Sequence, residues 1–189
     1  TISDLDTFPK LLVENARARG TRPAIREKDL GIWQTWSWSQ TEKEIRALAC
    51  GLVAYGFERG DRLAIIGDNR PQLYWAMVAA QFDGGVPVPV YQDSVAEEML
   101  YILEHADARF AIAENQEQVD KLLEIKDRCP KLEHIIYKDP RGMRDYNFPF
   151  IHFMEDVQEK GRQYDADHPG YAEGKIKEGK GSDIAIMLY

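Results

Sequence analysis

The stretch that decides the fold covers residues 62–91 and reads RLAIIGDNRPQLYWAMVAAQFDGGVPVPVY. Its apolar run at 63–66 predicts a strand, and the turn at 67–71 supplies a proline suited to the first turn of a helix. Gly84-Gly85 ends that helix, and the prolines within 86–91 favour a second extended strand. Because proline cannot donate a ladder hydrogen bond, we expect this second strand at an edge or beside a loop. The stretch is therefore typical of a parallel βαβ unit.

The same alternation of strands and helices continues after this unit. A capping box, Ser94-Val95-Ala96-Glu97, predicts the start of a helix that runs to His105, and a further helix is predicted at 116–129. Apolar runs at 109–113 and 134–137 predict the strands between and after these helices. This order predicts the α/β class, with a wound, mostly parallel sheet and flanking helices.

The residues before this unit predict a helix, a β-hairpin and a second helix. The first helix is expected at 7–19, and two strands at 24–28 and 32–38 are joined by Asp29-Leu30-Gly31. A capping box, Ser39-Gln40-Thr41-Glu42, predicts the start of the second helix. Trp33, Trp36 and Trp38 indicate cross-strand packing, and an aromatic ligand cage is the alternative.

The last third of the chain carries weaker signals. A helix is predicted at 151–163, a mobile polar loop at 165–182, and a buried strand at 183–189. A buried strand of a parallel sheet normally leads into a loop and a helix. We therefore expect residues 1–189 to be a single incomplete domain.

Composition excludes several classes of protein. The 189 residues include 24 Lys plus Arg and 32 Asp plus Glu, for a net charge of −8, so nucleic acid is a poor partner. Cys50 and Cys129 lie far apart, which argues against a disulfide scaffold or a zinc site and favours the reducing cytoplasm. No apolar run approaches the roughly 20 residues that a membrane helix needs.

The residues contain no recognisable reaction centre. The segment 174–182, GKIKEGKGS, is close to a P-loop, but the hydroxyl that binds Mg²⁺ would fall at Gly181, so a solvated loop is expected. No serine lies in a G-x-S-x-G pattern, and neither cysteine has an evident base. The four histidines (His105, His134, His152 and His168) are scattered along the chain, and we expect no metal site from them.

Three ordered segments resemble a known family. They are the motif Trp36-Ser37-Trp38-Ser39, the strand and turn at 61–69, and the glycine- and proline-containing segment at 79–91. Together they resemble the AMP-forming acyl-activating ligases, most closely the long-chain fatty-acid–CoA ligase branch. The chain departs from the family pattern at Thr41-Glu42, where an acidic residue and leucine are usual, and at Phe82-Asp83, where Lys-Ala or Ala-Gly pairs are common.

The resemblance implies a two-step activity for the full-length protein. A carboxylic acid would react with ATP and Mg²⁺ to give an acyl-adenylate, and the thiol of coenzyme A would then displace AMP. In the family, the phosphate loop follows the strand that corresponds to 183–189, and the metal-positioning, ribose-binding and C-terminal-lobe residues lie further on. No catalytic, cofactor-binding or metal-binding residue is therefore assigned within 1–189. Tyr189 is the one positional candidate, with a structural role preferred, and the 189 residues alone are expected to be inactive and to hold no cofactor.

A second hypothesis belongs to another class of protein. The chain could be a doubly wound, non-catalytic module that binds a small ligand or regulates a partner. Its ligand should then lie at the carboxyl ends of the strands, near Gly67-Asp68-Asn69. The residues give no indication of the oligomeric state.

Overall fold

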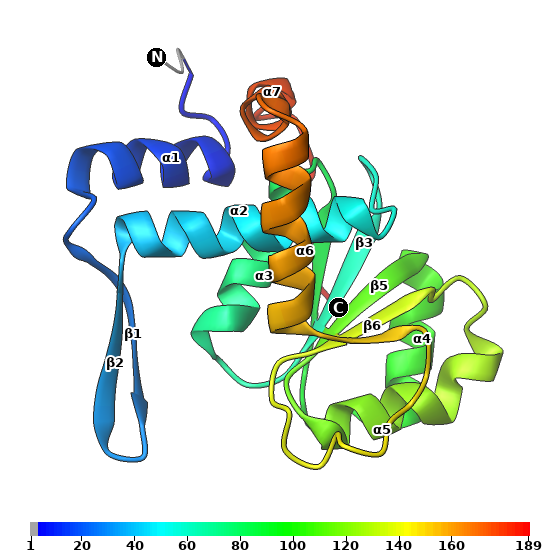
Figure 1. Ribbon diagram of the computed structural model, residues 1–189. Coiled ribbons are helices and arrows are strands. Elements are labelled where there is room, and N and C mark those ends of the chain that lie inside the picture. Colours follow the sequence, from blue (N-terminus) through cyan, green and yellow to red (C-terminus); the bar gives the residue numbers. More distant parts are fainter. Residues whose placement is uncertain (1–3) are drawn as a thin grey trace.

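The computed structural model describes residues 4–189, which form a five-stranded parallel sheet and a separate two-stranded hairpin (Figure 1). The strand order is β4-β3-β5-β6-β7, and every neighbouring pair is parallel. The strands are β3 (Arg62–Ile66), β4 (Val86–Val90), β5 (Ala108–Ala113), β6 (His134–Tyr137) and β7 (Ile151–Phe153). The predicted α/β class and the parallel βαβ unit are confirmed.

Helices cover both faces of this sheet. Because side chains alternate along a strand, Leu63 and Ile65 pack with α2, α3 and α6, whereas Ala64 and Ile66 pack with α4 and α5. No helix within residues 4–189 is both long enough and apolar enough to cross a membrane. The helices are α1 (Phe8–Arg19), α2 (Trp38–Ala54), α3 (Pro71–Phe82), α4 (Ala96–Ala106), α5 (Gln116–Ile125), α6 (Met154–Asp167) and α7 (Tyr171–Glu178), with a 3-10 turn η1 (Lys126–Arg128) after α5.

Strand β4 lies at the edge of the sheet, as its prolines predict. Within residues 4–189 it pairs with β3 alone. The carbonyl of Pro87 accepts a hydrogen bond of 3.0 Å from the amide of Met187. Residues 183–189 nevertheless form no regular strand, and the prediction of a strand there is wrong. One isolated hydrogen bond does not make a ladder, because β4 offers few donors in return.

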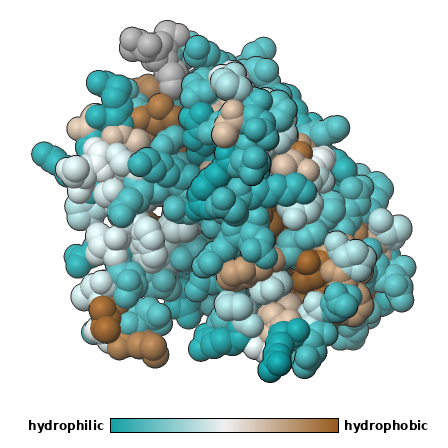
Figure 2. Space-filling view, viewed as in Figure 1, coloured by the Kyte–Doolittle hydropathy of each residue, from teal (hydrophilic) through white to brown (hydrophobic). Residues whose placement is uncertain are grey.

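The predicted hairpin is confirmed as the antiparallel pair β1 (Pro23–Asp29) and β2 (Ile32–Ser37). Trp36 packs edge-on against Trp75 of α3, with ring centroids 5.6 Å apart, while Trp33 lies beneath the guanidinium of Arg26. The tip of the hairpin is apolar and projects away from the sheet, and Leu30 there is 94% exposed (Figures 1 and 2). The tryptophans therefore pack against different neighbours and do not form one cage.

Both predicted capping boxes are wrong in position. Strand β2 ends at Ser37, one residue earlier than predicted, and the helix begins at Trp38 with Ser37 as its cap. The amide of Ser37 donates a hydrogen bond of 2.9 Å to the side-chain oxygen of Gln40. The S-x-x-Q pattern two residues earlier thus takes the place of the expected box at Ser39. The second box fails because α4 starts at Ala96 after Val95, which provides no side-chain cap.

The last third differs most from the prediction. Residues 151–153 form β7, so the helix expected at 151–163 is α6, which begins at Met154. A three-residue strand has no periodicity of its own and exists through its pairing with β6. The polar segment 165–182, expected as a loop, contains the end of α6 and helix α7, which buries only Ala172 and Ile176. The helix expected at 116–129 ends at Ile125 and continues as the 3-10 turn.

Helices α2 and α6 approach closely through glycine. A Cβ atom on Gly161 would lie 1.8 Å from the carbonyl oxygen of Ala47, and one on Gly51 would lie 2.2 Å from that of Val157. These distances allow no side chain at either position. The two glycines therefore fix how α6 crosses α2, in front of the sheet in Figure 1.

Candidate functional site

The carboxyl ends of β3, β4 and β5 lie together at one edge of the sheet. Ile66, the last residue of β3, is in register with Val90 of β4 and with Ala113 of β5. The residues that follow these strands therefore meet, and they include the turn Gly67-Asp68-Asn69 and Glu114. Ligands of open α/β sheets bind outside the carboxyl ends of the strands.

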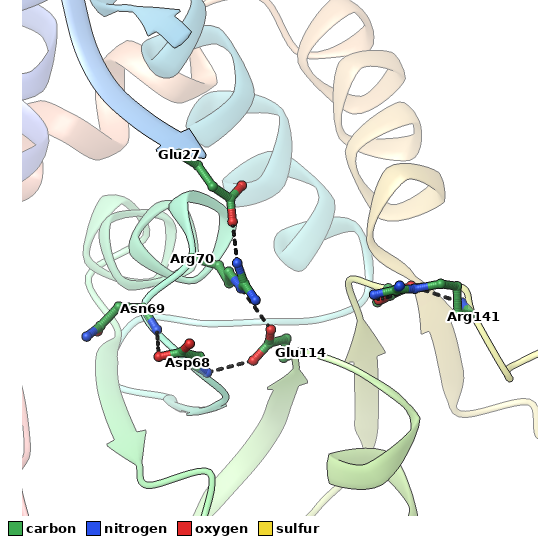
Figure 3. A network of polar contacts seen from close by, with 7 residues as sticks. Glu27, Asp68, Asn69, Arg70, Glu114 and Arg141 are labelled. Atoms are coloured by element: carbon green, nitrogen blue, oxygen red, sulfur yellow. Dashed lines mark hydrogen bonds and ion pairs between the residues drawn. The ribbon is translucent and has the colours of Figure 1, made fainter. Parts of the chain in front are cut away.

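Glu114 is the centre of a network of polar contacts at this edge (Figure 3). Glu114 is only 9% exposed. Its carboxylate accepts hydrogen bonds from the amide of Asp68 at 2.7 Å and from Nε of Arg70 at 3.0 Å. Arg70 also donates to Glu27 of β1 at 2.9 Å. Glu114 first, and then Glu27, raises the pKa of Arg70 by hydrogen bonding. The network therefore fastens the hairpin to the edge of the sheet.

The turn after β3 is held tightly by its own side chains. A Cβ atom on Gly67 would lie 2.5 Å from Cβ of Glu114, so only glycine allows this contact. Asp68 accepts a hydrogen bond of 2.8 Å from the amide of Asn69, and Tyr74 donates one of 3.0 Å to the side chain of Asn69. Contacts within the chain thus fix the conformation of the turn.

A cavity of about 290 Å³ opens beside this turn, between the ends of β3 and β4. Its walls are mainly apolar, and Asp68, Asn69 and Tyr74 add polar groups on one side. It lies where the hypothesis of a small-ligand module places its ligand. Its other lining residues are Ile65, Gly67, Leu73, Met77, Pro89, Val90, Tyr91, Leu188 and Tyr189.

Both arginines near the turn are already paired with carboxylates. Arg70 is occupied by two carboxylates, and Arg141, the other cation in Figure 3, is held by Asp139 at 2.8 Å. The remaining side chains near the turn, Asp68 and Glu114, carry negative charge and would repel an anion. Within residues 4–189, no group of three or more His, Cys, Asp or Glu side chains could hold a metal ion.

Tyr189, the positional candidate, lies in the cavity wall and contacts helix α4. Its hydroxyl is 2.7 Å from Nδ1 of His105, and the two rings meet edge-on. Tyr101, one turn earlier on α4, stacks on His105. These contacts hold the end of the described chain against α4. His105 lies in the last turn of α4, as the sequence indicates.

Two histidines that lie 18 residues apart in sequence are brought together on the last two strands of the sheet, β6 and β7, at the edge opposite β4. Nδ1 of His134 in β6 lies 3.0 Å from Nε2 of His152 in β7, and the ring of Tyr55 packs on His152 with centroids 4.3 Å apart. Nζ of Lys160 lies 3.8 Å from the centroid of the Tyr55 ring. Burial first, then the charges of His134 and Lys160, lower the pKa of His152 to about 4. Sequence reasoning missed this pair because it placed His152 in a helix.

The glycine- and lysine-containing segment 174–182 does not form a phosphate loop. Its first half lies in α7, where Lys175 pairs with Glu178 at 3.0 Å. The amide of Gly181 donates to Asp6 at 2.8 Å. Both cysteines are buried thiols, and burial raises the pKa of Cys50 to about 12. Neither segment nor thiol adds a reactive group to the sheet edge.

Comparisons with known proteins agree with this architecture. The chain matches the AMP-binding enzyme family over residues 12–189. It is 33% identical over 134 residues to the long-chain-fatty-acid–CoA ligase ACSBG2 of Xenopus laevis. The matched region covers 70% of this chain and 18% of the relative. The chain is 30% identical over 145 residues to the long-chain-fatty-acid–CoA ligase ACSBG1 of Bos taurus, which covers 76% of this chain and 20% of the relative.

Solved structures show the same fold. The crystal structure of coronafacic acid ligase from Pectobacterium brasiliense has a TM-score of 0.70 and 19% sequence identity, and the match covers 80% of this chain and 29% of that chain. The chain spans about a fifth of the length of the curated relatives it matches. The family match over almost the whole sequence, together with the parallel sheet, leads to one conclusion: this chain belongs to the AMP-binding enzyme family.

Proposed function

We propose that this chain is the N-terminal part of an AMP-forming acyl-CoA ligase of the cytoplasm that activates fatty acids, with long-chain acids preferred. The observation that supports the proposal is the family match over residues 12–189, joined to two relatives whose names describe long-chain-fatty-acid–CoA ligases. The reaction joins the acid to AMP with release of pyrophosphate, and coenzyme A then replaces AMP to give a thioester.

In this proposal, residues 4–189 provide a scaffold and the reacting groups lie in polypeptide that follows Tyr189. The paired state of Arg70 supports this division, because the two carboxylates that it contacts, Glu27 and Glu114, would compete with a triphosphate for its guanidinium. The Glu114 network would keep the turn Gly67-Asp68-Asn69 rigid beside the reacting groups. Rigid support of this kind is what positioning of reactants requires.

The test compares the complete protein with residues 1–189 alone. Each is incubated with ATP, Mg²⁺, coenzyme A and one acid from a panel that contains acetate, benzoate and fatty acids of increasing length. We expect the complete protein to release pyrophosphate and AMP and to form the thioester fastest with long-chain acids. We expect no product from residues 1–189.

Two outcomes would contradict this proposal. If the complete protein formed no acyl-adenylate with any acid, trapped as the hydroxamate by added hydroxylamine, the ligase assignment would be wrong. If residues 1–189 formed the adenylate alone, the division between scaffold and reacting groups would be wrong. A preference for short-chain or aromatic acids would contradict only the proposed preference for long-chain fatty acids and would leave the ligase assignment in place.

A further inference from the structure

The tip of the hairpin carries three large apolar side chains that are mostly in water. Leu30, Ile32 and Trp33 are 94%, 65% and 57% exposed. They lie on or beside the turn that joins β1 and β2, and this end of the hairpin projects away from the sheet (Figures 1 and 2). Apolar side chains gathered on an exposed surface mark sites of interaction more often than scattered ones do.

The turn itself holds a leucine where leucine is unfavourable. Leu30 and Gly31 are its central residues, and both have positive φ angles, 45° and 82°. A hairpin turn of this shape favours asparagine, aspartate or glycine at the first of these positions, because a bulky side chain is strained there. Leu30 is therefore both strained and exposed, and it contributes no packing to the described fold. A contact outside that fold would explain an apolar side chain at this position.

One face of the hairpin is basic next to this tip. The guanidinium of Arg26 lies 5.0 Å from the centroid of the Trp33 ring and donates to Thr35 at 3.2 Å, so these three residues share a face. Because side chains alternate along a strand, Lys28, which is opposite Trp33 in the ladder, lies on the same face. Within residues 4–189, neither Arg26 nor Lys28 forms an ion pair.

The acidic residues of the two strands lie on the opposite face. Glu27 alternates with Arg26 and Lys28, and its carboxylate accepts a hydrogen bond of 2.9 Å from Arg70. Asp29, which is exposed, lies on the same face as Glu27 by the same alternation. The hairpin therefore combines two unpaired cations with an apolar tip, in a chain whose net charge is −8. This face is complementary to a negatively charged surface.

We propose that the hairpin tip docks the protein on a lipid bilayer that carries anionic headgroups. Leu30 and Ile32 enter the boundary between headgroups and acyl chains, and Trp33 lies at the interface, where tryptophan is enriched. Arg26 and Lys28 contact the anionic headgroups. An apolar insertion and a basic contact are together the two signals that stable binding of a protein to a membrane surface requires.

A protein partner or a second copy of the chain fits this tip less well. At about 200 Å² for each large side chain, the three exposed side chains offer less than the roughly 800 Å² that each side of a stable protein interface buries. The tip is also convex, so a protein partner would need a matching groove, whereas a bilayer needs none.

The base of the hairpin is anchored, so the tip is presented on a rigid support. Arg70 joins Glu27 to Glu114, and Trp36 packs against Trp75. Docking of this kind needs no acid, ATP or coenzyme A. It therefore goes beyond the proposed ligase reaction, and either proposal can fail without the other.

Sedimentation with vesicles tests the docking. The complete protein is mixed with vesicles of phosphatidylcholine alone, or of phosphatidylcholine with about 30% phosphatidylserine. We expect saturable binding to the vesicles that contain phosphatidylserine, about tenfold tighter than to phosphatidylcholine alone. Raising the salt concentration should weaken this binding, because it screens the attraction between the basic face and the headgroups.

The variant L30N/I32T removes two of the apolar side chains and keeps the local conformation. Asparagine suits the positive φ at the turn, and threonine keeps a β-branched side chain in the strand. The hairpin should therefore fold, which a thermal melt checks, while vesicle binding should weaken by about tenfold or more. The matched control is V95T/I184T, which changes two side chains that are 58% and 62% exposed elsewhere, and it should bind as the unmodified protein does.

The variant R26Q/K28Q tests the basic face. It should remove most of the preference for phosphatidylserine, because no unpaired cation would remain beside the tip. The matched control is K43Q/K177Q, which removes two exposed lysines from α2 and α7 and should keep the preference.

Quenching by lipids with brominated acyl chains tests whether the tip itself enters the bilayer. These lipids quench the fluorescence of an indole that lies among them. We expect the unmodified protein to be quenched, and W33F to lose most of this quenching while it still binds, because phenylalanine also inserts at the interface.

Four results would overturn the proposal. The first is the absence of vesicle binding by the complete protein, as would occur if another protein or another part of the polypeptide covered the tip. The second is equal weakening by L30N/I32T and V95T/I184T. The third is equal loss of the phosphatidylserine preference in R26Q/K28Q and K43Q/K177Q, which would show that only net charge matters. The fourth is unchanged quenching in W33F, which would place another surface on the bilayer.

Discussion

Glu114 and Asp83 are buried carboxyl groups at opposite ends of the same sheet, and their surroundings differ completely. Glu114 follows β5 at the carboxyl edge and accepts hydrogen bonds from Asp68 and Arg70. Asp83 precedes β4 at the amino edge and is 2% exposed, and neither of its carboxyl oxygens has a hydrogen-bond partner within residues 4–189. One carboxyl group is therefore fully compensated for its burial, and the other is not.

The helices explain part of this difference. Glu114 lies just before the start of α5, where the partial positive charge of a helix favours a carboxylate. Asp83 ends α3, where the partial charge is negative. Burial raises the pKa of Asp83 well above its ordinary value, and the charge of Lys175 opposes this shift. We therefore expect Glu114 to stabilise the fold at the carboxyl edge of the sheet, and the burial of Asp83 to cost stability at the amino edge.

The largest effect on stability is expected from E114A, which removes the buried carboxylate that is hydrogen-bonded at the carboxyl edge of the sheet. Asp68 would lose its acceptor, and Arg70 would keep Glu27 as its only carboxylate, so the hairpin would be held less firmly. We expect the free energy of unfolding to fall by about 2 kcal/mol, which allows for the partial exposure of Arg70. Urea denaturation measures this loss.

The control for that experiment is E117A. Glu117 is an exposed carboxylate in the first turn of α5, three residues from Glu114. Its removal should change the free energy of unfolding by no more than about 0.5 kcal/mol. A loss in E114A as small as that of E117A would show that the network contributes nothing to stability.

The next effect has the opposite sign. D83A removes a buried carboxyl group that has no hydrogen-bond partner among residues 4–189, and we expect the free energy of unfolding at neutral pH to rise by about 1 kcal/mol. The small cavity left by the side chain limits the gain. If D83A were destabilised, Asp83 would have a partner in solution, and Lys175, whose charge lowers the pKa of Asp83, would be the candidate.

The pH dependence gives a second view of Asp83. Its pKa in the fold lies above 3.8, so the unfolded chain loses the proton first as the pH rises. The contribution of Asp83 to stability therefore falls as the pH rises above about 4. The gain from D83A should be larger at pH 7.5 than at pH 4.5, as urea denaturation at each pH would measure. An equal gain at both values would contradict a raised pKa.

The sequence predicts one half of this comparison better than the other. Strand ends at 66 and 113 follow from apolar runs, and a parallel sheet brings such ends together, so the position of Glu114 beside Gly67 was open to prediction. The departure at Phe82-Asp83 is visible in the sequence as well. The burial of Asp83 could not be predicted, because it depends on helix α7. The polar sequence of that segment indicates a loop, not a helix.

The histidine pair shows the same limit. The order of elements predicts β6, and hence the place of His134, but β7 is three residues long and gains its stability from pairing with β6. Local patterns therefore predicted the core of the sheet and the helices next to it. Contacts between distant segments made the Glu114 network, the unpartnered Asp83 and the pair of His134 with His152.

The smallest effect concerns this pair, and its pH dependence is opposite to that of Asp83. The pKa of His152 is lowered from 6.5 to about 4, so below pH 6.5 the unfolded chain binds a proton that the fold excludes. Stability is therefore lost as the pH falls from 6.5 towards 4. H152Q keeps a neutral polar partner for His134 and should reduce this loss by a fraction of 1 kcal/mol, because the pair is half exposed and screened.

Urea denaturation between about pH 4.5 and pH 7 measures how the free energy of unfolding changes with pH. The measurement is made in the D83A variant, because the opposite pH dependence of Asp83 would otherwise mask that of His152. In D83A the free energy of unfolding should therefore rise more steeply with pH than in the unmodified protein. Adding H152Q to D83A should make this rise less steep. H168Q is the matched control, since His168 is an exposed histidine that stacks on Tyr164. If H152Q and H168Q changed the slope equally, the buried pair would have no special part in the acid sensitivity. The contrast between the two ends of the sheet would then rest on Asp83 and Glu114 alone.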